Sequence, residues 1–135
     1  MSVLVDTPVW SQLFRRTEPD PGIRESLTRL IEEGDAILIG PIRQEILCGV
    51  RDPKQFVRLR DALRAFPDEP IFTTDYEEAA VFFNRCRTAG IQGSNTDFLI
   101  CAVGVRLQAP IFTLDRDFEH FAVALPIALY SRPVM

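Results

Sequence analysis

The fold of this 135-residue chain is decided near its start, by the stretch Ser2-Val3-Leu4-Val5-Asp6-Thr7-Pro8. Residues 2–6 are aliphatic and β-branched with a polar end, which is typical of a short buried strand. Thr7 and Pro8 then predict a helix start, with Thr7 as the N-cap and Pro8 at the first helical position. We therefore expect a strand that leads directly into a helix.

The same alternation of strand and helix continues along the chain. Further strands are predicted over residues 36–39, 110–114 and 125–130, and residues 71–72 form either a short strand or an extended connection. Apolar residues at helical spacing fill the segments between them. Buried strands alternating with helices predict an α/β fold with a mainly parallel central sheet covered by helices on both faces. The length suits one domain, residues 1–135, with one core.

Composition restricts where the protein works. An apolar content of 47% and a charged content of 25% are those of a globular protein. No apolar run approaches the roughly 20 residues that a membrane-spanning helix needs. The N-terminus lacks the basic region of a signal peptide, and Asp6 comes too early for one. We expect a cytoplasmic protein without membrane contacts.

The small number of histidine and cysteine residues limits the catalytic mechanisms and metal sites that the chain can form. His120 is the only histidine, which excludes two-histidine acid–base catalysis and histidine-rich metal sites. Cys48, Cys86 and Cys101 are scattered, so each is predicted to be a small core residue, not part of a disulfide framework or zinc site. If the protein is hydrolytic, carboxylates must carry the reaction.

Net charge gives no general attraction to nucleic acid, because it is −4. Of the fifteen basic residues, fourteen are arginine, the side chain that pairs bidentately with phosphate. This bias is compatible with RNA binding, and a GC-rich coding sequence would produce it too.

Four acidic residues are candidates for a functional site: Asp6, Glu45, Asp97 and Asp115. Asp6 and Asp115 end predicted strands, so both should lie beyond the carboxyl edge of the sheet, where the sites of open α/β sheets are found. Asp97 begins a helix that is apolar all round from Phe98 to Val105 and should be buried. Glu45 lies beside Ile42 on a helix predicted from Pro41 to about Gly49.

Each acid also has a structural interpretation. Asp6 and Asp97 could cap helices, although Thr7 and Ser94-Asn95-Thr96 already offer capping oxygens beside them. Asp115 shares its turn with Asp117, and one of these two is expected to be structural. Glu45 could be a solvated residue at the flank of its helix.

Together, the four carboxylates predict a divalent-cation site. They would repel one another strongly unless they were protonated or neutralised by a cation. Oxygen ligands without histidine or cysteine suit Mg²⁺, with Mn²⁺ as a second candidate. Thr7, Ser94 and Thr113 stand beside the acids and are predicted to orient them by hydrogen bonds.

The ordered set of motifs resembles the PIN-domain family, and most of all its VapC-type toxins. The motifs are Val3-Leu4-Val5-Asp6-Thr7, Glu45 in a helix after the second strand, Asn95-Thr96-Asp97-Phe98-Leu99-Ile100-Cys101-Ala102, and Thr113-Leu114-Asp115-Arg116-Asp117-Phe118. The resemblance covers essentially the whole chain and implies a PIN-like three-layer sandwich. One departure is Cys101, where alanine is more usual in the family.

The resemblance implies a Mg²⁺-dependent endoribonuclease that acts as the toxin of a toxin–antitoxin pair. Asp6 and Asp97 would be the main metal ligands, with Glu45 and Asp115 completing the site. Metal-activated water would attack an RNA phosphodiester and leave a 5′-phosphate. The resemblance also implies a homodimer, and a cognate antitoxin whose C-terminal segment occupies a groove that Trp10, Leu13 and Phe14 could line.

Other readings fit less well or stay open. A receiver domain would need an adjacent acidic pair after the first strand, and a haloacid-dehalogenase-type phosphatase would need an aspartate where Pro8 stands. The alternative of another class is a non-catalytic binding or regulatory module that retains the PIN fold.

Overall fold

The structure, a computed structural model, describes residues 1–14 and 20–131. Its central sheet has three parallel strands in the order β2-β1-β3. The strands are β1 (Val3–Val5), β2 (Ala36–Ile37) and β3 (Ile111–Phe112). The middle strand, β1, is buried along its whole length, as its aliphatic sequence predicts. The α/β class and the parallel sheet are confirmed.

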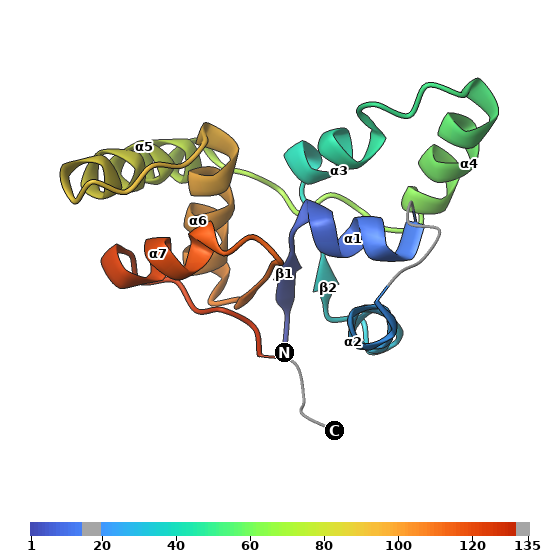
Figure 1. Ribbon diagram of the computed structural model, residues 1–135, viewed down its shortest axis with the longest axis horizontal. Helices are drawn as coiled ribbons and strands as arrows, with labels where there is room; N and C mark the ends of the chain where they lie inside the picture. The colour runs from blue at the N-terminus through green and yellow to red at the C-terminus, as the bar shows by residue number, and fades with distance from the viewer. Residues whose placement is uncertain (15–19, 132–135) are drawn as a thin grey trace.

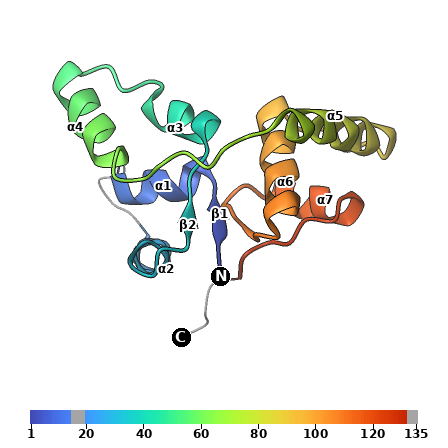
Figure 2. The same ribbon diagram turned by 180° about the vertical axis from the view of Figure 1, so that it is seen from behind.

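Helices cover both faces of this sheet, as Figure 1 shows and Figure 2 repeats from behind. One group holds α1 (Thr7–Phe14), α2 (Pro21–Glu32), α3 (Gly40–Leu47) and α4 (Pro53–Leu63). The other group holds α5 (Thr73–Thr88), α6 (Asn95–Leu107) and α7 (Asp117–Ala124). The predicted three-layer sandwich is therefore present.

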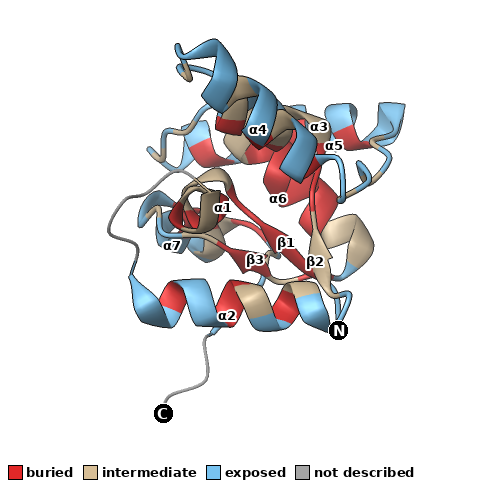
Figure 3. Cartoon of the chain, turned by 90° about the vertical axis from the view of Figure 1, so that its right-hand side faces the viewer, coloured by how far each residue is buried: buried red, intermediate tan, exposed pale blue. Residues whose placement is uncertain are grey.

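Helix α6 is the most deeply buried helix of the fold. Every residue from Phe98 to Gly104 is buried, which confirms the prediction from its apolar sequence. Gly104 lets the helix approach the sheet closely, because a Cβ there would lie 3.2 Å from the Ile111 side chain and 3.3 Å from the Ala109 carbonyl oxygen. Figure 3 shows the buried residues of α6 behind the strands. The first turn of α6 is thereby held at the end of the sheet.

The sheet is smaller than the sequence predicts. The predicted strand over residues 125–130 is wrong, because this segment forms only an isolated parallel bridge between Leu129 and Ile111. Pro126 has no N–H to donate, and the segment lies at the edge of the sheet beyond β3, where pairing is possible on one side only. Of the two predictions for residues 71–72, the extended connection is confirmed and the short strand is not, since Phe72 is the extended N-cap of α5.

One cysteine prediction is also wrong. Cys86 and Cys101 are buried as expected, but Cys48 is exposed. The reason is its position at the C-cap of α3, where the chain leaves the helix for the loop before α4. Among the described helices, none is both long and apolar enough to span a membrane.

Candidate active site

Four carboxylates influence one another at the carboxyl edge of the sheet. Asp6 directly follows β1, Glu45 lies in α3, Asp97 lies in the first turn of α6, and Asp115 lies between β3 and α7. The negative charges of Asp97 and Glu45 raise the pKa of Asp6, and those of Asp115 and Glu45 raise the pKa of Asp97. The fold thus brings together the four residues that the sequence singled out, and we call them the acidic cluster.

Asp6 is the buried member of the cluster, with 6% of its surface exposed. Burial is the main cause that raises its pKa from 3.8 to about 6, and the nearby carboxylates add to it. Two hydrogen bonds act in the opposite direction: Oδ2 accepts one from the Thr113 hydroxyl at 2.7 Å, and Oδ1 accepts one from the Thr7 backbone N–H at 2.8 Å. The carboxylate is therefore held by both oxygens and is costly to ionise.

Thr7 does not cap α1, which corrects the sequence prediction. The first backbone hydrogen bonds of the helix run from the N–H groups of Val9 and Trp10 to the Asp6 carbonyl, so Asp6 takes the N-cap position and Thr7 is the first residue of α1. The Thr7 hydroxyl instead donates to Oε2 of Glu45. A hydroxyl gains more from a carboxylate acceptor than from a neutral one, because the charged acceptor strengthens the hydrogen bond.

Asp97 takes part in the N-terminal cap of α6. The sequence predicted instead that Ser94, Asn95 and Thr96 would cap this helix without it. Ser94 is the N-cap of α6, its hydroxyl accepts from the Asp97 N–H at 3.1 Å, and its own N–H donates to Oδ2 of Asp97 at 3.0 Å. This reciprocal pair is a capping box. Within the described residues, Oδ1 of Asp97 accepts no hydrogen bond. The side chain is therefore anchored by one oxygen and can offer the other to a ligand.

The geometry around α7 distinguishes Asp115 from Asp117. The Asp115 N–H donates to the Thr113 hydroxyl at 3.0 Å, and its Oδ1 accepts from the Asp117 N–H at 2.9 Å. Asp115 also raises the pKa of Asp97, whereas Asp117 is exposed and is not among the causes of that shift. Asp115 is thus the acid of this turn that belongs to the cluster.

The threonines link the cluster across the fold. Thr113 joins the ends of two neighbouring strands, because its hydroxyl donates to Asp6 and accepts from Asp115. Thr7 joins α1 to Glu45, which is otherwise an exposed residue of α3. Both threonines were predicted to orient the acids, but their hydrogen-bond partners lie 107 residues away for Thr113 and 38 residues away for Thr7, so the sequence does not identify these partners.

The carboxylate oxygens of the acidic cluster are ligands that suit a hard divalent cation. In this structure, however, the four carboxylates do not converge on one point. No group of three or more His, Cys, Asp or Glu side chains within residues 1–14 and 20–131 is arranged to hold a metal ion. Two observations favour a cation all the same. The cluster consists of oxygen ligands only, and a buried carboxylate with a pKa of about 6 lies beside other negative charges. Bringing such groups closer together requires a neutralising cation or protons.

Cys101 lies near the cluster without joining its chemistry. It is fully buried in α6, and burial raises the pKa of its thiol, with Asp97, Cys86 and Asp6 adding to the shift. The thiol therefore stays protonated, and a protonated thiol is neither a nucleophile nor a good metal ligand.

The apolar residues of α1 have different environments. Trp10 is fully buried and its indole N–H donates to the Val5 carbonyl at 3.0 Å, so it belongs to the core and is not available for a partner. Leu13 and Phe14 are partly buried. Phe14 also lines a surface groove of about 430 Å³ together with Val50, Arg51 and Arg58.

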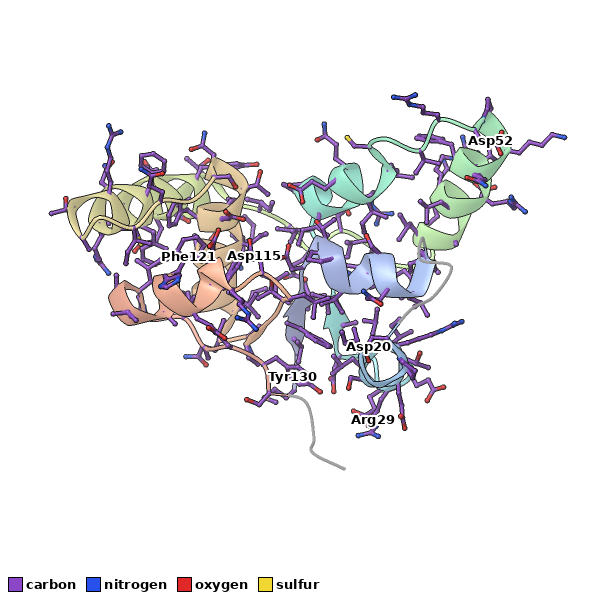
Figure 4. All side chains as sticks on the ribbon, viewed as in Figure 1. Asp20, Arg29, Asp52, Asp115, Phe121 and Tyr130 are labelled. Carbon is purple, nitrogen blue, oxygen red and sulfur yellow. The ribbon has the colours of Figure 1, made fainter. Side chains whose placement is uncertain are left out.

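In Figure 4 the labelled Asp115 lies between α1 and the group formed by α5, α6 and α7. The two groups of helices meet at this position. The N-terminus lies at the opposite end of β1 in Figure 1. The acidic cluster therefore occupies the end of the sheet that faces away from the N-terminus.

Known proteins resemble the chain along most of its length. A family model for the PIN domain matches residues 3–124. Ribonuclease VapC11 from Mycobacterium tuberculosis is 32% identical over 127 residues, which cover 89% of this chain and 91% of that protein.

Two solved structures share the fold. FitAcB from Neisseria gonorrhoeae superposes with a TM-score of 0.80 at 21% identity and covers 96% of this chain and 97% of its own. VapBC2 from Rickettsia felis, bound to a DNA fragment from its promoter, gives a TM-score of 0.76 at 14% identity, with 96% and 98% covered. The match to the PIN-domain model and the identity with Ribonuclease VapC11 both agree with the acidic motifs of the sequence. The chain therefore belongs to the PIN-domain family.

Proposed function

We propose that this protein is a metal-dependent ribonuclease and that the acidic cluster is its active site. The observation that carries the proposal is the buried carboxylate of Asp6 at the end of the central strand, with a pKa of about 6 beside three further acids. Such a concentration of negative charge is costly to the fold, and a function that needs it is the simplest reason for it. The similarity to Ribonuclease VapC11 supports RNA as the substrate.

The cation that we propose is Mg²⁺, with Mn²⁺ as an alternative. Asp6 and Asp97 would hold it, with Glu45 and Asp115 completing the cluster. When bound, such a cation lowers the pKa of a water molecule and neutralises charge that develops on a phosphate.

The chain's own residues prepare the site for this reaction. Thr113 fixes the carboxylate of Asp6 and the backbone of Asp115 in one arrangement. Ser94 anchors one oxygen of Asp97 and leaves the other available. Water would add to the phosphorus atom of an RNA phosphodiester and the bond to the 3′-oxygen would break. The products would be a 5′-phosphate and a 3′-hydroxyl.

The proposal is tested by incubating the purified protein with single-stranded RNA, with Mg²⁺ and with EDTA. We expect cleavage with Mg²⁺ only. Asp6→Asn and Asp97→Asn should each reduce the cleavage rate by at least about a hundredfold, in the range found for residues that stabilise charge in transition states.

Asp117→Asn is the matched control, because Asp117 shares the turn of Asp115 but does not belong to the cluster. This variant should cleave RNA at the wild-type rate. Equal cleavage by the wild type, Asp6→Asn and Asp97→Asn would overturn the proposal.

One observation favours the alternative of a non-catalytic module that retains the fold. In the described part of the chain, the carboxylates are not arranged as a ready metal cage. The same experiment decides between the two functions, since a non-catalytic module would leave RNA intact with and without Mg²⁺.

We also propose that the protein is the toxin of a toxin–antitoxin pair and forms a homodimer. The support is the similarity to Ribonuclease VapC11 and the shared fold with FitAcB and VapBC2. The antitoxin segment would occupy the groove that Phe14 lines, where Arg51 and Arg58 suit carboxylates of the partner. Expression of the wild type should arrest bacterial growth, co-expression of the neighbouring gene should relieve the arrest, and Phe14→Asp should prevent the relief.

A further inference from the structure

A second feature lies directly beside the acidic cluster. A cavity of about 410 Å³ opens between α5, α6 and the start of α3. Asn95 and Thr96 line it and directly precede Asp97, and Pro41 lines it one turn before Glu45 on the same helix. A molecule bound in this cavity would therefore lie next to the acidic cluster.

The walls of the cavity are aromatic and uncharged. Tyr76 of α5 lines it and is 56% exposed, so its ring is available for contact. Phe83 and Phe98 form the inner wall, where their rings meet edge to face at 5.6 Å between centroids. None of the described residues that line the cavity carries a charge. Such a wall suits a flat, uncharged ring and not a phosphate group.

Two amide side chains supply polarity at the rim of the cavity. Asn84 and Asn95 both line it, and within residues 1–14 and 20–131 their side chains make no hydrogen bond. Each amide carries donors and an acceptor, which match the edges of nucleobases. The volume lies within the range of about 300–1,000 Å³ that is usual for small-ligand sites.

An arginine lies on the other side of the same aromatic wall. Arg87 lines a neighbouring cavity of about 320 Å³, which shares Phe83 and Phe98 with the first. Across the described ranges of the chain, the guanidinium of Arg87 makes no ion pair and donates no hydrogen bond. A guanidinium without a carboxylate partner can pair with a phosphate. In an acidic protein with net charge −4, this provides local positive charge beside an uncharged cavity.

We propose that the cavity beside the acidic cluster binds one nucleobase of single-stranded RNA, the base next to the phosphodiester that is cleaved. Tyr76 stacks on the base, Asn84 and Asn95 contact its edge, and Arg87 pairs with a phosphate further along the strand. This inference rests on the ribonuclease function proposed above and adds a site that selects the RNA. Unstacked bases of single strands are commonly bound in this way, by aromatic faces and hydrogen bonds to base edges.

The experiment uses a short single-stranded RNA and copies of it in which one nucleotide at a time is abasic. Binding is measured by fluorescence anisotropy in EDTA, and cleavage is measured with Mg²⁺. For the wild type, one abasic position beside the cleaved bond should weaken binding by roughly tenfold, the loss expected when one stacked base is removed. Tyr76→Ala should bind the intact RNA more weakly than the wild type by about the same factor. For this variant, the RNA with the abasic position should bind no more weakly than the intact RNA.

Each control variant matches the tested variant either in helix or in residue type. Val81→Ala changes an exposed residue of α5 that does not line the cavity, and it should bind RNA like the wild type. Arg87→Ala should reduce the slope of log affinity against log salt by about one, whereas Arg24→Ala, on α2, should leave the slope unchanged. These variants should keep the fold, because each changes an exposed residue: Tyr76, Val81, Arg87 or Arg24.

Three outcomes would overturn the inference. The first is that RNA binding is the same in Tyr76→Ala, Val81→Ala and the wild type. The second is that no abasic position weakens binding to the wild type. The third is that Tyr76→Ala changes the oligomeric state in sedimentation experiments without changing RNA affinity, which would identify the cavity as a contact between copies of the chain. Failure of the ribonuclease function itself is a separate result, the absence of cleavage by the wild type.

Discussion

At the scale of single residues, Asp6 is the side chain whose environment conflicts most with its charge. Its folded-state pKa of about 6 lies above the ordinary value of 3.8, so the folded protein favours the protonated form. The contribution of Asp6 to the free energy of unfolding should therefore decrease as pH rises from about 4 to about 6. Above about pH 6 this contribution should stay constant. A difference of about two pKa units corresponds to at most about 3 kcal/mol.

The variant Asp6→Asn should lack this pH dependence in the metal-free protein. Its stability relative to the wild type should increase between about pH 4 and pH 6, because asparagine needs no proton to remain neutral. The measurement is urea unfolding in EDTA across this pH range, with Asp117→Asn as the control. A stability difference between Asp6→Asn and the wild type that does not change with pH would contradict the account.

Thr113 is predicted to act through Asp6 and Asp115. Thr113→Val removes the hydroxyl that donates to Asp6 and accepts from the Asp115 N–H, while keeping the shape of the side chain. The cleavage rate should decrease by about 10- to 100-fold, as is typical when a residue that orients metal ligands is lost. Thr113→Ser keeps the hydroxyl and should retain most of the activity. A Thr113→Val enzyme as active as Thr113→Ser would exclude this role.

At this scale the sequence identifies the candidate residues but not their hydrogen-bond partners. The four acids and the orienting hydroxyls were identified from their positions at strand ends and helix starts. The hydrogen-bond partners were not, because Thr7 contacts Glu45 and Thr113 contacts Asp6 only after the chain has folded. The same reason explains the incorrect N-cap assigned to Thr7, whose hydroxyl has a stronger acceptor in a distant carboxylate.

At the scale of elements, the first turn of α6 contains both a helix cap and one member of the acidic cluster. Asp97→Asn keeps an oxygen that can accept from the Ser94 N–H, so the capping box should survive and stability should change little. Asp97→Ala removes this acceptor and should cost about 0.5–2 kcal/mol. Thermal unfolding of both variants measures the difference. Equal destabilisation by alanine and asparagine would show that the cap contributes nothing.

One buried ion pair joins α5 to α6. Arg106 of α6 donates from Nε to both oxygens of Asp75, at 2.8 and 3.1 Å, and from Nη2 to the Pro70 carbonyl at 2.9 Å. The Asp75 side chain is only 3% exposed. Removing the guanidinium would leave this carboxylate with the Phe72 N–H as its hydrogen-bond donor among the described residues.

Arg106→Leu should therefore destabilise the protein strongly, near the low end of the roughly 3–5 kcal/mol found when one partner of a buried pair is removed. The control is Arg29→Leu, which breaks an exposed pair with Glu25 of 3.9 Å and should cost less than about 1 kcal/mol. Urea unfolding of both variants measures the costs. Similar costs would show that burial of Asp75 does not matter.

Sequence patterns predicted long elements better than short ones. The helix over residues 95–107 was recognisable because its apolar residues extend round the whole circumference, and it is buried accordingly. The segment 125–130 has an equally apolar sequence but forms only a bridge at the edge of the sheet. Local composition does not report whether a neighbouring strand is available on both sides, which is a property of the assembled sheet.

At the scale of the whole molecule, topology determines the site. A parallel sheet with β1 in the middle brings the ends of β1 and β3 and the first turn of α6 to one edge. The order of the motifs was sufficient to predict this edge, because crossover connections place all parallel strands in the same direction. The distances between the carboxylates depend on packing and could not be predicted from the order alone.

Isothermal titration of Mg²⁺ into the protein measures whether the acidic cluster binds a divalent cation. The wild type and Asp117→Asn should bind with the same affinity, and Asp97→Asn, which retains its cap and its fold, should bind at least about tenfold more weakly. Binding should also release protons at pH 6, since Asp6 is partly protonated there. Equal Mg²⁺ affinity for the wild type and Asp97→Asn, or no binding to the wild type, would show that the acidic cluster is not a cation site.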